Sequence, residues 1–135
     1  MRIKLTCFWI VLLVMIPACG DSGPQRFQLS GEAKFDGQPI VYGDVVFTPD
    51  GSKSNSGPQG VAYINNGKFD TRGPEGKGIA GGPTVIHVRG LSAQGGKLVC
   101  EYELSVDLPK ADGKYDLAIP KEAAAKKVTK PVPEI

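Results

Sequence analysis

The chain has 135 residues, of which 16 are Lys or Arg, 14 are Asp or Glu and one is His, and its formal net charge is +2. This length suits one domain of about 100 ordered residues rather than two. The small charge argues against a nucleic-acid-binding protein, which needs a basic patch. The single histidine excludes a metal cluster built from histidines.

The N-terminal residues have the pattern of an export signal. Arg2 and Lys4 form a positive n-region, and the almost wholly apolar run from Leu5 to Ile16 is 12 residues long. A membrane-spanning helix needs ~20 apolar residues, so a signal h-region fits better. The run ends in the sequence IPAC at residues 16–19, which resembles the bacterial lipobox. The resemblance implies cleavage between Ala18 and Cys19 and a diacylglycerol on the Cys19 sulfur.

Removal of residues 1–18 changes the charge and the cysteine content of the mature chain. Arg2 and Lys4 are lost from the 16 basic residues, so 14 remain against 14 acidic ones and the formal charge becomes zero. Of the three cysteines, Cys7 is removed and Cys19 is acylated, which leaves Cys100 alone and excludes an intramolecular disulfide. Residues 19–25 form a flexible tether, and its six residues after the cysteine reach at most ~20 Å from the membrane.

The mature domain spans residues 26–120, and its first half is predicted to be β-structure. Apolar and polar side chains alternate over residues 26–36, as in a half-buried strand. Turn residues follow at 36–39, and Tyr42–Thr48 forms a second strand. Residues 61–70 form a hairpin, because Asn66-Gly67 supplies the positive φ angles that a tight turn requires. Gly- and Pro-rich loops cover Pro49–Gln59 and Gly73–Pro83.

The second half of the domain continues the same pattern. Thr84–Arg89 is a strand with Ile86 and Val88 on one face, and Leu98–Leu108 is the clearest strand of the chain. A last strand runs through Tyr115, Leu117 and Ile119. About seven short antiparallel strands without a helical apolar period predict an all-β fold, a small antiparallel β-sandwich. Residues 121–135 are expected to be a frayed C-terminal tail with at most one turn.

Two segments of the domain resemble a known family. Residues 29–40 read LSGEAKFDGQPI and residues 43–49 read GDVVFTP. This pattern is similar to the opening of carboxypeptidase regulatory-like domains, which are transthyretin-like β-sandwiches, and above all to short lipoproteins of planctomycete bacteria. The resemblance covers residues 27–90 well and 98–120 loosely. The chain departs from the family at residues 81–84, where GGPT replaces the usual Pro-Gly-x-Tyr. The resemblance implies a fold and brings no catalytic residues with it.

Several groups of residues have some features of a catalytic or binding site, and none of them predicts one. His87 is expected to face solvent, and Cys100 is expected to be a buried, inert thiol. The loop Gly73–Gly78 lacks the spacing of a phosphate-binding loop, and Asp50–Asn55 has too few carboxylates for calcium. Three carboxylates share one face of the clearest strand, which favours a solvated face over a glycosidase pair. They are Glu101, Glu103 and Asp107.

The sequence therefore predicts a lipid-anchored protein of the cell envelope, at the outer membrane or the periplasmic face rather than in the cytoplasm. Its expected role is non-catalytic, either binding or structural, with no catalytic residue, cofactor or metal and no nucleic-acid partner. Sheet edges and the two long loops are the expected contact surfaces for an envelope protein or a glycan. Two alternatives stay open: a small carbohydrate-active or ureide-type hydrolase, and an accessory subunit of an envelope complex or transporter.

Overall fold

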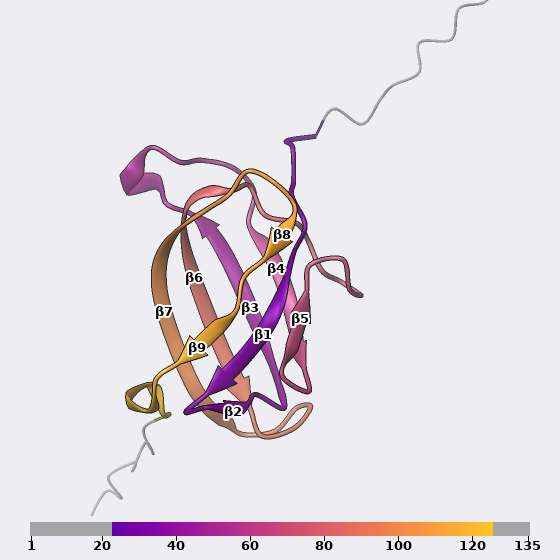
Figure 1. Ribbon diagram of the computed structural model, residues 1–135, viewed down its shortest axis with the longest axis vertical. Coiled ribbons are helices and arrows are strands. Elements are labelled where there is room, and N and C mark those ends of the chain that lie inside the picture. Colours follow the sequence, from indigo (N-terminus) through magenta and orange to yellow (C-terminus); the bar gives the residue numbers. More distant parts are fainter. Residues whose placement is uncertain (1–22, 126–135) are drawn as a thin grey trace, which may run out of the picture.

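The computed structural model describes residues 23–125 (Figure 1). The signal peptide at 1–18, the cleavage and lipidation at Cys19, the start of the tether and residues 126–135 of the tail lie outside the described residues. Over residues 23–125 no helix has the length and apolar character needed to span a membrane. The helical segments there are two three-residue 3-10 turns, η1 (Gly51–Lys53) and η2 (Lys121–Ala123).

The described residues form nine strands, seven of which have three or more residues, so the predicted all-β class is confirmed. The long strand β7 has the bounds expected from the sequence. In chain order the strands are β1 (Leu29–Phe35), β2 (Gln38–Pro39), β3 (Tyr42–Pro49), β4 (Gly60–Asn65), β5 (Lys68–Asp70), β6 (Gly82–Leu91), β7 (Leu98–Leu108), β8 (Gly113–Lys114) and β9 (Leu117–Ile119).

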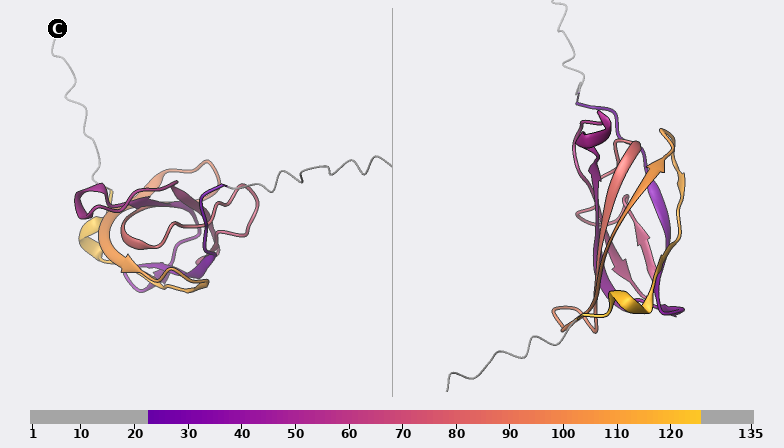
Figure 2. Two further views of the ribbon diagram at one scale, coloured as in Figure 1. Left: turned by 90° about the horizontal axis from the view of Figure 1, so that it is seen from above. Right: turned by 90° about the vertical axis from the view of Figure 1, so that its left-hand side faces the viewer.

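The strands form one curled sheet in the order β2-β1-β5-β4-β3-β6-β7, with β8 and β9 also paired to β1. The curl brings β1, β8 and β9 over the layer that contains β3 and β6, and the strands enclose an oval when seen end-on (Figure 2). This arrangement has the two facing layers of a sandwich. Every pairing is antiparallel except those of β1 with β8 and β9, which are parallel.

The parallel pairing depends on a close approach at Gly31. A Cβ atom on Gly31 would lie 2.0 Å from the Tyr115 carbonyl oxygen, so only glycine admits the β8–β9 segment beside β1. Two aspartates of that segment accept backbone hydrogen bonds from β1 or the residue before it. Asp112 accepts from the Gln28 N–H at 2.7 Å, and Asp116 accepts from the Glu32 N–H at 2.9 Å.

The core lies between the two layers and consists mostly of inward-facing strand residues, together with Ile40 and with Ile79 from the segment predicted to be a loop. The rings of Phe47 on β3 and Phe69 on β5 meet there with their centroids 6.1 Å apart. Ile86 and Val88 of β6 are fully buried, as expected from their shared face. The buried apolar set is Leu29, Ala33, Ile40, Val45, Phe47, Ala62, Ile64, Phe69, Ile79, Ile86, Val88, Cys100, Leu108, Leu117 and Ile119.

The predicted hairpin turn is present between β4 and β5. Asn65 pairs with Lys68, so Asn66 and Gly67 are the two turn residues, and both have positive φ angles of 49° and 76°. These values suit the tight turn that matches strand twist. The turn between β1 and β2 has the same character at Asp36 and Gly37.

The start of the expected tail is folded onto the sheet. Residues 121–123 form η2, Ala124 makes an antiparallel bridge to Cys100, and the Ala125 N–H donates to the Val99 carbonyl at 2.8 Å. These contacts join the end of the chain after β9 to the first residues of β7. The fold therefore extends five residues past the predicted boundary at Pro120.

Candidate binding groove

The outer face of the sheet carries a row of polar side chains that crosses four strands. Tyr63 on β4 lies opposite Asp44 on β3, Asp44 lies opposite Arg89 on β6, and Arg89 lies opposite Glu101 on β7. Outward positions of neighbouring strands stand beside one another in a ladder, so this register places the four side chains in one line. A Tyr, a carboxylate and a guanidinium are thereby presented side by side to solvent.

An ion pair fixes the centre of this row. Arg89 Nη2 and Nε donate to the same oxygen of Asp44, Oδ1, at 2.7 and 3.1 Å. The hydrogen bond to Asp44 raises the pKa of Arg89 above its ordinary value, so the guanidinium stays charged. The Asp44 side chain is 16% exposed, and its Oδ2 atom accepts no hydrogen bond from the described residues. This oxygen is free to accept one from a ligand.

Tyr63 is an exposed aromatic residue on this face. Half of its surface is exposed, whereas its neighbours Ala62 and Ile64 point inward and are buried. Within the described part of the chain its hydroxyl group has no hydrogen-bond partner. A tyrosine in this state offers a flat apolar ring and a polar tip at little conformational cost.

A second row runs beside the first and crosses five strands. It joins Glu32, Lys68, Asn65, Tyr42 and Leu91, each opposite the next on the neighbouring strand. The Asn65 amide and the Tyr42 hydroxyl group make no hydrogen bond to the described residues. Tyr63, Asp44 and Arg89 of the first row and the residues of the second row form a floor with donors and acceptors available for a ligand.

Loops at the two ends turn this floor into an open groove of about 1330 Å³. The loop Gly73–Glu75 stands at one end, and the β6–β7 turn with Gln94 and Gly95 stands at the other. Five acidic and three basic residues line the groove, so its formal charge is only slightly negative. The charged lining residues are Glu32, Asp44, Asp70, Glu75, Asp116, Lys68, Arg89 and Lys114.

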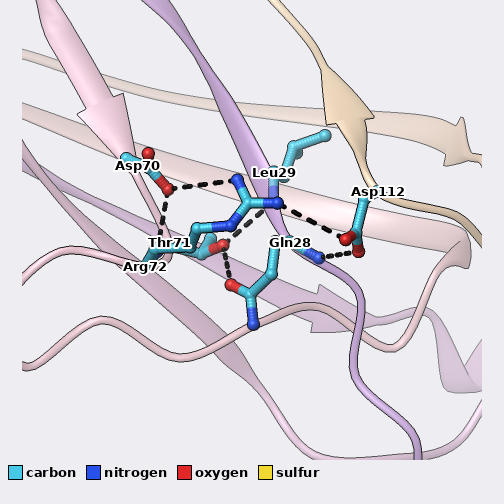
Figure 3. Close-up of polar contacts among 6 residues, drawn as sticks. All are labelled: Gln28, Leu29, Asp70, Thr71, Arg72 and Asp112. Atoms are coloured by element: carbon cyan, nitrogen blue, oxygen red, sulfur yellow. Dashed lines mark hydrogen bonds and ion pairs between the residues drawn. The ribbon is translucent and has the colours of Figure 1, made fainter.

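A polar network anchors the first of these loops to the start of β1 (Figure 3). Thr71 is 2% exposed, and its hydroxyl oxygen accepts the Leu29 N–H at 2.9 Å and donates to Gln28 Oε1 at 2.8 Å. Arg72 donates its backbone N–H to Asp70 at 2.8 Å and reaches Asp112 through its guanidinium at 3.4 Å. The loop that follows Arg72 therefore leaves the sheet from a fixed base.

His87 and the three carboxylates of β7 do not line the groove. His87 on β6 is partly exposed, and its Nε2 atom lies 2.9 Å from Glu101 Oε1. Glu103 is directly opposite His87 across the β6–β7 pair. Glu101, Glu103 and Asp107 are all exposed, as predicted for a solvated strand face. Over residues 23–125 no group of three or more His, Cys, Asp or Glu residues is placed to hold a metal ion.

Cys100 and Asp50 both make contacts within the fold. Cys100 is fully buried, and this burial raises the pKa of its thiol, which confirms the predicted buried thiol. Asp50 accepts hydrogen bonds from the side chain and the backbone N–H of Ser52 at the start of η1, and the side-chain bond is the main reason why its pKa is lowered. Lys53 follows in the same turn.

The groove itself was not predicted from the sequence. Its central residues lie far apart in the chain, since 19 positions separate Asp44 from Tyr63 and 45 separate Asp44 from Arg89. Only the pairing register of the strands brings them together. One sequence signal does exist, because Tyr63 is an aromatic residue on the polar face of an alternating strand.

No protein-family model and no curated protein sequence matches this chain. The resemblance to carboxypeptidase regulatory-like lipoproteins stays a prediction that rests on the residues quoted for it.

Proposed function

We propose that this protein is a lipid-anchored, non-catalytic binding protein of the cell envelope that holds a glycan chain in its outer groove. The observation that carries the proposal is the row of Tyr63, Asp44 and Arg89 on the floor of a wide, open groove. The lipid anchor rests on the lipobox at residues 16–19 and places the domain at the membrane.

The chemistry of the floor fits a hydroxyl-rich, nearly uncharged chain. The exposed ring of Tyr63 can cover the C–H face of a sugar, because an aromatic side chain combines apolar area with a fixed shape. Asp44 Oδ2, the Asn65 amide and the Tyr42 hydroxyl group supply acceptors and donors for sugar hydroxyl groups. The mixed charges of the lining give no strong field that would select a highly charged polymer.

A binding role is favoured over hydrolysis by the placement of the titratable groups. The chain has one histidine, and it contacts Glu101 beyond the margin of the groove. The hydrolase alternative would need an acid and a base that face a bound sugar from suitable distances. In the groove, Asp44 is held by two hydrogen bonds from Arg89 instead, which fix its orientation on the floor.

The test is binding of the full-length lipoprotein, extracted in detergent, to insoluble polysaccharide isolated from the envelope of the producing cell. Cosedimentation of wild type is compared with Tyr63→Ala and Asp44→Ala, and Val41→Ala serves as the control because Val41 is exposed but does not line the groove. We expect each groove variant to lose at least tenfold in affinity and the control to bind like wild type. Equal binding by all four proteins would refute the groove, and release of soluble sugar would replace binding with hydrolysis.

The anchor is tested separately by mass spectrometry of the mature N-terminus. We expect an acylated Cys19 as the first residue, and Cys19→Ala should give a chain without the acyl mass. An unmodified Cys19 in the wild-type protein would refute the anchor and leave the groove proposal standing.

A further inference from the structure

Among residues 23–125, strand β7 has a partner strand on one side only. It pairs with β6 from Leu98 to Leu108, with a register shift that leaves Val99 without a partner on β6. On its other side, residues 23–125 provide the bridge between Cys100 and Ala124, the bond from Ala125 to Val99 and a contact with the adjoining η2 turn. The stretch from Glu101 to Asp107 therefore has an open edge, in a strand of 11 residues. Figure 1 shows β7 at the margin of the sheet.

The bond from Ala125 identifies which backbone groups point to this edge. The Val99 carbonyl accepts the Ala125 N–H at 2.8 Å, so the backbone groups of Val99 point away from β6. Val99 lies at the register shift, but the regular part of the pair gives the same answer. The Pro83 carbonyl accepts the Asp50 N–H, so alternate residues of β6 from Pro83 on point to β3, and their partners on β7 point to the open edge. Glu101, Glu103, Ser105 and Asp107 therefore present their N–H and C=O groups at the open edge, where a further strand can bind them.

The side chains along the edge are sorted by face. Tyr102, Leu104 and Val106 point inward, are only half-buried and pack against the core at the margin of the sheet. The outward residues include three exposed acids, and among the described residues only Glu101 has a side-chain partner, namely His87 at 2.9 Å. An added strand would cover the half-buried apolar residues and would set its own outward side chains beside Glu103 and Asp107.

We propose that the β7 edge from Glu101 to Asp107 is the docking site for an extended segment of a partner protein. The segment carries apolar side chains at its inward positions and Lys or Arg at its outward positions. Backbone hydrogen bonds of this added strand hold the segment, and the charges select it. This site is separate from the groove, and it extends the proposed binding role from a glycan to a protein.

Charge makes a second copy of this chain a poor occupant of the edge. Two β7 strands paired antiparallel about Leu104 would place Glu101 opposite Asp107 twice. Like charges directly opposite one another destabilise a sheet. The same acids attract a basic segment, so charge complementarity distinguishes the two occupants.

The experiment measures binding of two synthetic peptides to the full-length lipoprotein in detergent, together with amide hydrogen exchange. One peptide alternates Lys and Val over eight residues, and the other alternates Glu and Val. We expect the Lys–Val peptide to bind at least tenfold more tightly. It should slow exchange at the amides of Glu103, Ser105 and Asp107 and leave the already bonded amides of Tyr102 and Leu104 unchanged.

Two variants test the two parts of the proposal. Glu103→Lys combined with Asp107→Lys should reverse the preference between the peptides. Ser105→Pro removes a backbone N–H group at the open edge and should weaken binding of the Lys–Val peptide at least tenfold. The matched variant Ser105→Ala keeps this N–H group and should bind the peptide like wild type. If Ser105→Pro does not fold, the charge reversal alone decides.

Each other outcome overturns the proposal. Protection of the edge amides without peptide, together with a concentration-dependent dimer, would assign the edge to a second copy. Equal binding of both peptides, or binding without protection at the edge, would show that β7 is not the site. Tyr63→Ala should not affect peptide binding, so failure of this proposal and failure of the groove proposal are distinguishable.

Discussion

Gly90 and Cys100 form a tight contact inside the domain. Substitution of either residue gives a quantitative test of the packing. The two residues are opposite one another on β6 and β7. A Cβ atom on Gly90 would lie 2.6 Å from the Cys100 sulfur and 3.2 Å from Ile40 Cγ2. Normal contacts between carbon atoms are about 3.5–4.0 Å, so Gly90→Ala creates an overlap of roughly 1 Å with the sulfur. We expect this overpacking to cost about 1–3 kcal/mol.

The double mutant decides whether the sulfur is the cause. Cys100→Ala alone removes a buried sulfur and should cost about 1–2 kcal/mol. In Gly90→Ala/Cys100→Ala the new methyl group occupies part of the vacated space. The double mutant should therefore be more stable than the sum of the single effects by about 1–2 kcal/mol.

Urea unfolding followed by far-UV circular dichroism measures these differences, since the only tryptophan, Trp9, lies in the predicted signal. Gly113→Ala is the matched control, because a Cβ atom there has no neighbour within 4 Å. It should change the free energy of unfolding by less than about 0.5 kcal/mol. Additive effects of the two core substitutions would refute the contact between the Gly90 position and the sulfur.

Two further predictions concern buried polar and titratable groups. Thr71→Val leaves the Leu29 N–H without its side-chain acceptor and should lower the free energy of unfolding in urea by about 1–3 kcal/mol. Thr71→Ser should keep the hydrogen bond, and equal stability of the two variants would contradict this prediction. Burial raises the pKa of the Cys100 thiol, so above the unfolded pKa of about 8.5 the native state keeps a proton that the unfolded state has lost. The free energy of unfolding should therefore fall as pH rises from there through the folded pKa, and Cys100→Ala should remove this part of the slope. Native protein should also react with Ellman's reagent at pH 8 far more slowly than protein in urea, and equal rates would show that the thiol is accessible.

The sequence by itself was enough to predict the fold class and the longest strands. From Cys100 to Leu108, β7 alternates apolar and polar residues, and a pattern of that length determines both the strand and its faces; Leu98 and Val99, at the register shift, are both exposed. The turn at Asn66-Gly67 was also readable, because positive φ angles at two successive positions restrict the residues that fit. Burial of Cys100 followed from its place on the apolar face of β7. All of these features are local, and local sequence encodes them.

Only the tertiary structure decided how distant segments meet. The parallel pairing of β1 with β9 depends on the space above Gly31 and on backbone bonds to Asp112 and Asp116, 84 residues away in each case. The groove exists because the register aligns Tyr63, Asp44 and Arg89 on three strands. A strand's alternation tells which side chains face outward, and it carries no information on which neighbour they stand beside. That choice is made by the packing of the whole sheet around its core, which is why the fold class was visible in the sequence and the candidate site was not.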